Sequence, residues 1–215
     1  MSIIYAIPGI GTTKELFQNI AVAGHELKIL EWPAAEKQFT MTDYAKAFIP
    51  QIDTQQPVNL MGVSFGGMLC AELSHHISTK KVVLISSCRN RREFPFLLRF
   101  LRVVPVHKLI SERLFRRLVE RTYYVFGFDK NLAHAFAAMA WQMPPHYFSR
   151  CIDYIIQWKR TDDHPSIVSI HGDADRLLTP TNIRKGYSIK GGSHVMVLEK
   201  ANDINPILSK EFYGC

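Results

Sequence analysis

Cysteine is scarce in this sequence, and the few cysteines present form no recognisable motif. The chain has four, with no C-x-x-C pair and no spacing typical of a metal site, at Cys70, Cys88, Cys151 and Cys215. Cysteines scattered in this way are typical of thiols that stay reduced. We therefore expect a protein of the cytoplasm with free thiols.

Segments that direct a chain to a membrane are also absent. Residues 1–9 contain no basic group and are too short for a signal peptide. No apolar run approaches the ~20 residues that a helix needs to cross a bilayer. We expect neither a signal peptide nor a transmembrane segment.

Motifs for nucleotides and metals are incomplete. Residues 9–14 begin like G-x-G-x-x-G but end in Lys14, and they also lack the G-x-x-x-x-G-K-[ST] order of a phosphate-binding loop. The sequence contains no H-E-x-x-H, and the pair His75-His76 has no acidic or cysteine partner at metal-binding spacing. We expect no metal and no cofactor, with the histidine pair on a helix surface.

Positive charge is confined to one segment. The net charge is +7, and residues 89–121 contain ten Lys or Arg against three Asp or Glu. The remainder is close to neutral, which argues against a general nucleic-acid-binding protein. The length of 215 residues suits one domain with an inserted subdomain.

The most informative motif that is present is the pentapeptide Gly62-Val63-Ser64-Phe65-Gly66. It matches G-x-S-x-G, a strand-to-helix turn that exposes a serine hydroxyl at the top of a sheet. An apolar run at 58–61 precedes it and a helical pattern follows it, as this turn requires. We take Ser64 as the candidate nucleophile; the alternative is an ordinary serine in a glycine-rich turn.

Short apolar runs alternate with helical patterns along most of the chain. We expect strands at 3–7, 26–30, 58–61, 81–86, 166–171 and 187–189. We expect helices at 42–52 with Thr40 or Thr42 as its cap, at 65–78, and at 195–212 with a break near Pro206. Regular alternation of this kind indicates an α/β fold: a mostly parallel sheet with helices on both faces.

Residues 88–163 interrupt this alternation with a purely helical pattern. Apolar residues recur at helical spacing in 96–102, 109–125, 132–143 and 147–158. We predict that 88–163 form an all-helical insertion, and that 1–87 and 164–215 form the core domain.

A serine nucleophile needs a base, and the base needs an orienting acid. Where the nucleophile lies on a strand-to-helix turn, the chain order is Ser, then Asp or Glu, then His. Asp175 and His194 follow Ser64 in that order, each in a loop after a predicted strand. Asp173 is an alternative acid, and His194 could instead be a surface histidine. His171 precedes the acid, so we expect a structural role at a strand end.

At these residues the chain resembles the α/β-hydrolase superfamily. The resemblance rests on Pro8-Gly9-Ile10-Gly11, the turn at Ser64, His171-Gly172-x-x-Asp175, and Gly191-x-x-His194. It implies Ser64 as nucleophile, His194 as base and Asp175 as acid, with the backbone N–H groups of Ile10 and Phe65 as the oxyanion hole. It also implies that the helical insertion is a cap or lid. Pro8 stands where the family often has histidine. The family's leading hairpin is absent, so we expect about six strands in the order 2-1-3-4-5-6.

These observations predict a serine hydrolase that cleaves a carboxylic ester, thioester or related acyl bond through an acyl-enzyme. The alternatives are an acyltransferase or a lyase on the same scaffold, because fold does not decide the reaction. A binding protein that keeps the scaffold without turnover is a further alternative.

The sequence of the basic insertion is compatible with three different roles. Its helices could be solvated amphipathic elements, a roof that attracts an acidic or apolar acyl substrate, or a surface in weak contact with an anionic membrane. We expect a small-molecule partner and no nucleic acid.

Overall fold

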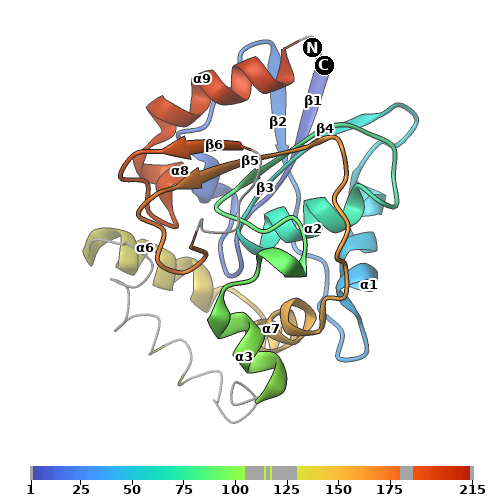
Figure 1. Ribbon diagram of the computed structural model, residues 1–215, viewed down its shortest axis with the longest axis vertical. Coiled ribbons are helices and arrows are strands. Elements are labelled where there is room, and N and C mark those ends of the chain that lie inside the picture. Colours follow the sequence, from blue (N-terminus) through green and yellow to red (C-terminus); the bar gives the residue numbers. More distant parts are fainter. Residues whose placement is uncertain (1, 105–113, 115–116, 118–129, 180–185, 214–215) are drawn as a thin grey trace.

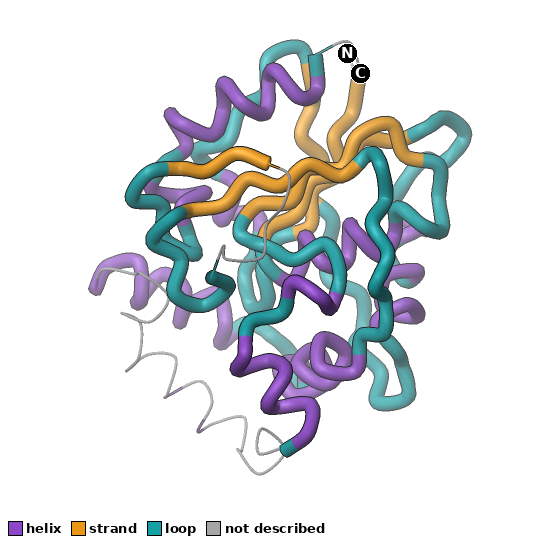
Figure 2. Tube along the Cα trace, in the orientation of Figure 1, coloured by secondary structure: helices purple, strands orange, loops and turns teal. Residues whose placement is uncertain are grey.

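A twisted sheet of six parallel strands forms the centre of the molecule (Figures 1 and 2). The computed structural model describes residues 2–104, 114, 117, 130–179 and 186–213. The strands are β1 (Ser2–Ile7), β2 (His25–Ile29), β3 (Val58–Val63), β4 (Thr79–Ile85), β5 (Ile167–Gly172) and β6 (Gly186–Ile189). Their order is β2-β1-β3-β4-β5-β6, and every pair is parallel. The predicted order is confirmed.

Helices cover both faces of this sheet, as predicted. They are α1 (Met41–Lys46), α2 (Phe65–Leu73), α3 (Phe96–Val103), α6 (Lys130–Trp141), α7 (Tyr147–Gln157), α8 (Met196–Glu199) and α9 (Ala201–Phe212). Three short 3-10 helices lie at Lys14–Phe17, Ile49–Gln51 and Arg91–Glu93. Figure 1 shows α9 on one side of the sheet and α1 and α2 on the other.

The two faces have separate cores because successive side chains of a strand point to opposite sides. Tyr5 and Ile7 of β1 pack in a cluster with residues of α1, α2 and α7. Ile4 and Ala6 of the same strand pack in a second cluster with residues of α8 and α9. Since both sides of residues 4–7 of β1 are buried, this part of the strand is a continuous apolar run.

Two predicted helices are shorter than expected. α1 ends at Lys46, and a 3-10 turn containing Pro50 follows, because proline removes a backbone donor and prevents a continuous helix. Thr40 caps α1, accepting a hydrogen bond from the N–H of Asp43. α2 ends at Leu73 rather than at residue 78: the hydroxyl of Ser74 donates to the Ala71 carbonyl and satisfies one acceptor of the last turn.

The expected break near Pro206 is wrong. α9 continues through Pro206, and the chain instead breaks at Lys200, between α8 and α9. Pro206 lies in the second turn of α9, where its missing N–H leaves only the carbonyl of Asn202 without a helical partner. Asn202 is exposed, so water can satisfy that carbonyl.

Between β4 and β5, the chain forms α3, α6 and α7, in agreement with three of the four expected helical segments. The fourth, at 109–125, lies outside the described residues except for Leu114 and Arg117. The segment 180–185 before β6 also lies outside them. Within the described part of the chain, no helix has both the length and the apolar character needed to cross a bilayer.

Candidate active site

Ser64 occupies a strained turn between β3 and α2. Its backbone has φ 52° and ψ −119°, a conformation that residues other than glycine rarely adopt. The strain is tolerated because β4 and the residues just after it hydrogen-bond both the N–H and the carbonyl of Ser64. The N–H of Ser64 donates to the Ile85 carbonyl at 2.9 Å, and the hydroxyl of Ser87 donates to the Ser64 carbonyl at 2.6 Å.

The glycines of the pentapeptide are required by close backbone contacts. A Cβ on Gly62 would collide with the backbone of Gly66, and a Cβ on Gly66 would collide with the carbonyls of Ile7 and Pro8. The loop after β1 therefore lies directly against the turn that carries Ser64.

The structure brings Ser64, His194 and Asp175 together in one hydrogen-bonded chain. His194 Nε2 lies 2.9 Å from Ser64 Oγ, and His194 Nδ1 lies 2.9 Å from Asp175 Oδ2. His194 and Asp175 are buried, whereas Ser64 is partly exposed. A neutral His194 that donates from Nδ1 to the carboxylate leaves Nε2 as an acceptor for the serine proton.

The loops that carry the acid and the base are joined through their backbones. The N–H of Asp173 donates to the Ile189 carbonyl, and the N–H of Ala174 donates to the Gly192 carbonyl, each at 3.1 Å. Asp173 Oδ1 accepts the N–H of Gly191 at 2.6 Å. Asp173 is exposed and serves this junction, so the carboxylate on His194 belongs to Asp175.

Asp175 is held in its charged form. Oδ1 accepts the N–H groups of Leu177 and Leu178, each at 2.9 Å, while Oδ2 contacts His194 and His171. Burial by itself would raise the pKa of Asp175. The opposing influence of His194 and the hydrogen bonds from His171, His194 and Leu178 is larger and holds this pKa well below its usual range.

His171 contributes more to the site than its expected role at a strand end. Its Nε2 lies 3.1 Å from Asp175 Oδ2 and also contacts the Leu178 carbonyl. Both neighbours are acceptors, so Nε2 carries a proton and donates to them. The spacing of four residues between His171 and Asp175 was the feature of the sequence that could have indicated this contact.

The two expected oxyanion donors lie in backbone segments that touch. Phe65 is the first residue of α2, so its N–H has no partner within the helix. Neither the Phe65 nor the Ile10 N–H donates to another of the described residues. A Cβ on Gly9 would lie 3.7 Å from the Cβ of Ser64, which places the loop of Ile10 beside the serine.

Trp32 links these two segments, and sequence analysis missed it. Its indole N–H donates to the Thr12 carbonyl at 2.8 Å, and its ring stacks on Phe65 with centroids 5.9 Å apart. Thr12 in turn closes the loop by donating from its N–H and its hydroxyl to the Gly9 carbonyl. These contacts join residues far apart in the sequence, so no local pattern reveals them.

α7 also packs against this loop and against Trp32. Gly11 has φ +71°, and a Cβ added there would collide with the ring of Phe148. Tyr147 packs edge-on against Trp32, with centroids 5.6 Å apart. Among the described residues, no group of three His, Cys, Asp or Glu side chains is placed to hold a metal ion.

Comparison with known proteins finds similarity in structure rather than in sequence. No protein-family model matches the chain, and no curated protein is significantly similar to its sequence. A hydrolase from Pseudomonas aeruginosa PA01 superposes with a TM-score of 0.72 at 12 % identity, over 99 % of this chain and 90 % of that one.

Two further solved structures superpose equally well. The enol-lactonase from Burkholderia xenovorans LB400 has a TM-score of 0.72 at 13 % identity, over 98 % of this chain and 90 % of that one. MenH from S. aureus has a TM-score of 0.72 at 13 % identity, over 98 % and 92 %. The order of the parallel strands, the strained serine turn and these superpositions agree: the chain has the α/β-hydrolase fold.

Proposed function

We propose that this protein is a serine hydrolase acting on a carboxylic ester, thioester or related acyl bond. The observation that carries the proposal is the unbroken chain of hydrogen bonds from Ser64 through His194 to Asp175. A serine hydroxyl is a weak nucleophile at neutral pH, and an adjacent histidine oriented by a carboxylate is the arrangement that activates it.

In the proposed reaction Ser64 Oγ attacks the acyl carbon while His194 Nε2 accepts the hydroxyl proton. His194 then returns that proton to the leaving group as the scissile bond breaks, which leaves the acyl group on Ser64. Water, deprotonated by His194, attacks the acyl-enzyme, and His194 returns that proton to Ser64 Oγ as the acyl–oxygen bond breaks and the acid leaves. Asp175 holds the imidazole in the required tautomer and stabilises the transient imidazolium. The reaction needs no cofactor.

The N–H groups of Phe65 and Ile10 are the proposed donors to the oxyanion that forms at each tetrahedral intermediate. Their segments meet beside Ser64, and neither group is engaged elsewhere among the described residues. Removing one such donor typically raises the barrier by about 3 kcal/mol. In the proposed site, Trp32 positions both segments.

We further infer that the core consists of residues 1–87 and 164–215, and that 88–163 act as a lid over the site. Support comes from α7, whose Phe148 and Tyr147 pack on Gly11 and Trp32. Several structural neighbours carry the names hydrolase, enol-lactonase and carboxylesterase, which agrees with a hydrolase on this scaffold.

Replacement of Ser64 by alanine tests the proposal directly. The S64A protein should keep its fold by circular dichroism but lose hydrolysis of p-nitrophenyl esters across a series of acyl chain lengths. Hydrolysis by S64A at the native rate would show that another group performs the reaction.

A matched pair of aspartate variants tests the role of the acid. Asp175→Asn should lower kcat by ~10⁴, because the amide stabilises the wrong tautomer of His194. Asp173→Asn, two residues away, should leave kcat close to the native value. Equal losses in the two variants would remove Asp175 from the proposed mechanism.

A fluorophosphonate probe separates a hydrolase from a binding protein on the same fold. Labelling of the native protein and not of S64A would establish an activated serine, whereas an inert Ser64 would favour binding without turnover. Product analysis with water, alcohol and amine acceptors would then distinguish hydrolysis from acyl transfer.

A further inference from the structure

Four arginines line one surface hollow at the start of the helical insertion. The hollow has a volume of about 560 Å³, and its walls are Arg91, Arg92, Phe94, Arg99, Arg102 and Thr161. Phe94 is buried beneath it, while Arg92, Arg99 and Arg102 are exposed. The hollow thus combines four cations, one hydroxyl and an apolar floor.

These four guanidinium groups have no counter-ion within the described chain, where none of them forms an ion pair. The nearby carboxylates are engaged with other groups. Glu93 pairs with Arg89, Asp162 with Arg160, and Asp163 accepts the side-chain amide of Asn90. Four like charges gathered without a carboxylate raise the local positive potential, which an anion would relieve.

Hydrogen bonds to backbone carbonyls fix part of the hollow before any ligand arrives. Arg99 Nε donates to the Phe94 carbonyl at 2.8 Å, and Arg99 Nη2 donates to the Arg92 carbonyl at 2.7 Å. The N–H of Arg91 donates to the Arg160 carbonyl, which ties this turn to the segment that follows α7. An anchored guanidinium loses less conformational entropy when it binds an anion.

We propose that this hollow binds a phosphate group. Arginine forks match the tetrahedral oxygens of a phosphate and form charge-assisted hydrogen bonds with them. The hydroxyl of Thr161 provides a further donor, and Phe94 accommodates the apolar part next to the phosphate. The site is separate from Ser64 and does not depend on the reaction proposed there.

The phosphate could belong to a soluble compound or to a phospholipid headgroup. The helix that carries Arg99 and Arg102 also exposes Phe96 and Val103, which are 82 % and 80 % accessible. Exposed apolar side chains beside arginines suit an anionic bilayer surface, so the test includes a vesicle.

The experiment measures binding of two phosphate probes to the full chain. Isothermal titration calorimetry with inorganic pyrophosphate, at an ionic strength held constant with chloride, reports a soluble ligand. Flotation with phosphatidylcholine vesicles, with and without phosphatidylglycerol, reports a headgroup. The variant Arg92→Gln/Arg102→Gln removes two guanidinium groups, and binding should weaken roughly tenfold for each.

The control is Lys46→Gln/Lys80→Gln, which removes the same charge from exposed positions outside the hollow. Binding that the arginine variant loses and the lysine variant keeps supports the site, and the responding probe identifies the source of the phosphate. No binding of either probe, or equal loss in both variants, overturns the proposal. S64A should bind as the native protein does, so this result is independent of catalysis.

Discussion

Helices α7 and α3 each carry apolar side chains along one face, but only α7 buries them. Six residues of α7 are buried, at Tyr147, Phe148, Cys151, Tyr154, Ile155 and Ile156. α3 has no buried residue and exposes Phe96, Leu97, Phe100 and Val103. The difference lies in what each helix meets. α7 packs on α1 and on the loop beside Ser64, whereas α3 meets mainly the outer side of α7.

This contrast shows that helical periodicity reveals an apolar face without revealing what covers it. The two helices therefore have different structural roles. α7 is part of the structure that supports the candidate active site, and α3 presents its apolar side chains and arginines to the outside. Four substitutions test this difference between the supported and the exposed parts of the molecule.

The largest loss of stability is expected for Phe148→Ala in α7. Phe148 is 2 % exposed and fills the space above Gly11, so its removal leaves a cavity. The free energy of unfolding should fall by about 3–5 kcal/mol, as measured by urea denaturation. A loss below about 1 kcal/mol would show that α7 is no better anchored than α3.

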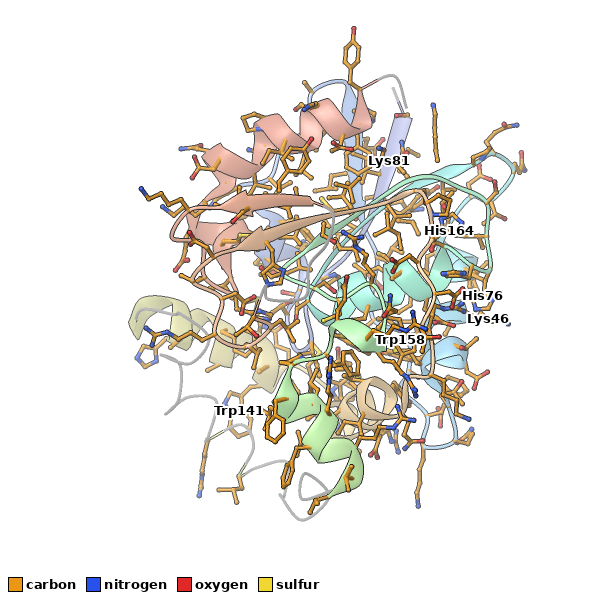
Figure 3. All side chains as sticks on the ribbon, in the orientation of Figure 1. Lys46, His76, Lys81, Trp141, Trp158 and His164 are labelled. Atoms are coloured by element: carbon orange, nitrogen blue, oxygen red, sulfur yellow. The ribbon has the colours of Figure 1, made fainter. Side chains whose placement is uncertain are left out.

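The stability of the contact between the end of α7 and the core should depend on pH, because the carboxylate of Glu72 holds the two together. This buried carboxylate accepts the indole N–H of Trp158 at 2.7 Å and two N–H groups of Arg160 at 2.7 and 2.9 Å. Figure 3 shows Trp158 and His76, which also contacts Glu72, on one side of the molecule. Burial raises the pKa of Glu72, but these hydrogen bonds and that of Thr42 outweigh it and lower the pKa to about 2.

Because the folded pKa of Glu72 lies below the unfolded value, its contribution is fully present above pH ~4.5 and is lost as the pH falls toward 2. The shift corresponds to at most about 3 kcal/mol. Glu72→Gln should lower the stability by this amount at neutral pH and reduce the loss between pH 4.5 and 2. An unchanged acid dependence would contradict the assignment.

A smaller effect, on activity, is expected for Trp32→Phe. Phenylalanine can still stack on Phe65 but cannot donate to the Thr12 carbonyl. Loss of one such hydrogen bond costs about 1 kcal/mol, so kcat should fall roughly fivefold with little change in KM. Trp158→Phe is the matched control: it should lower the melting temperature and leave kcat unchanged. Equal kcat values for native protein and Trp32→Phe would remove Trp32 from the support of the oxyanion donors.

The smallest effect is expected for Phe96→Ala in α3. The side chain is 82 % exposed, so the free energy of unfolding should change by no more than about 0.5 kcal/mol. The measurement is the same urea denaturation used for Phe148→Ala. A loss of about 2 kcal/mol or more would show that this face of α3 is covered in solution, and the contrast with α7 would fail.

The parallel sheet and the meeting of Ser64, His194 and Asp175 could be predicted from local patterns, whereas the strand order was implied by the resemblance to a known family. Alternating strands and helices dictate a parallel sheet, and parallel strands bring the loops at their carboxyl ends to one edge. Three residues in the right order, each after a strand, are then expected at that edge, where the structure joins them by hydrogen bonds. The choice between Asp173 and Asp175 was harder, since both follow the same strand and only their hydrogen bonds distinguish them.

The contacts that tertiary packing creates could not be predicted. Trp32 lies in sequence without a recognisable motif, and its contacts with Thr12 and Phe65 depend on how the loops after β1 and β2 pack together. For His171, the four-residue spacing to Asp175 was the one local signal of its contact. The effect of Pro206 depended on its position within α9, which no pattern placed accurately. For α3, the sequence predicted the helix but not the exposure of its apolar face.

In the proposed mechanism, the hydrogen bond between His194 and Ser64 also determines when a newly made chain can first become reactive. The two residues are 130 positions apart, and β1, β3 and β4, the strands paired on either side of the serine turn, all precede His194 in the chain. At ~5–20 residues per second, a ribosome needs roughly 6 to 26 seconds to cover that distance. During this interval the serine turn lacks its proposed base, so the proposed mechanism predicts that the nascent chain does not react with acyl compounds before His194 has been added.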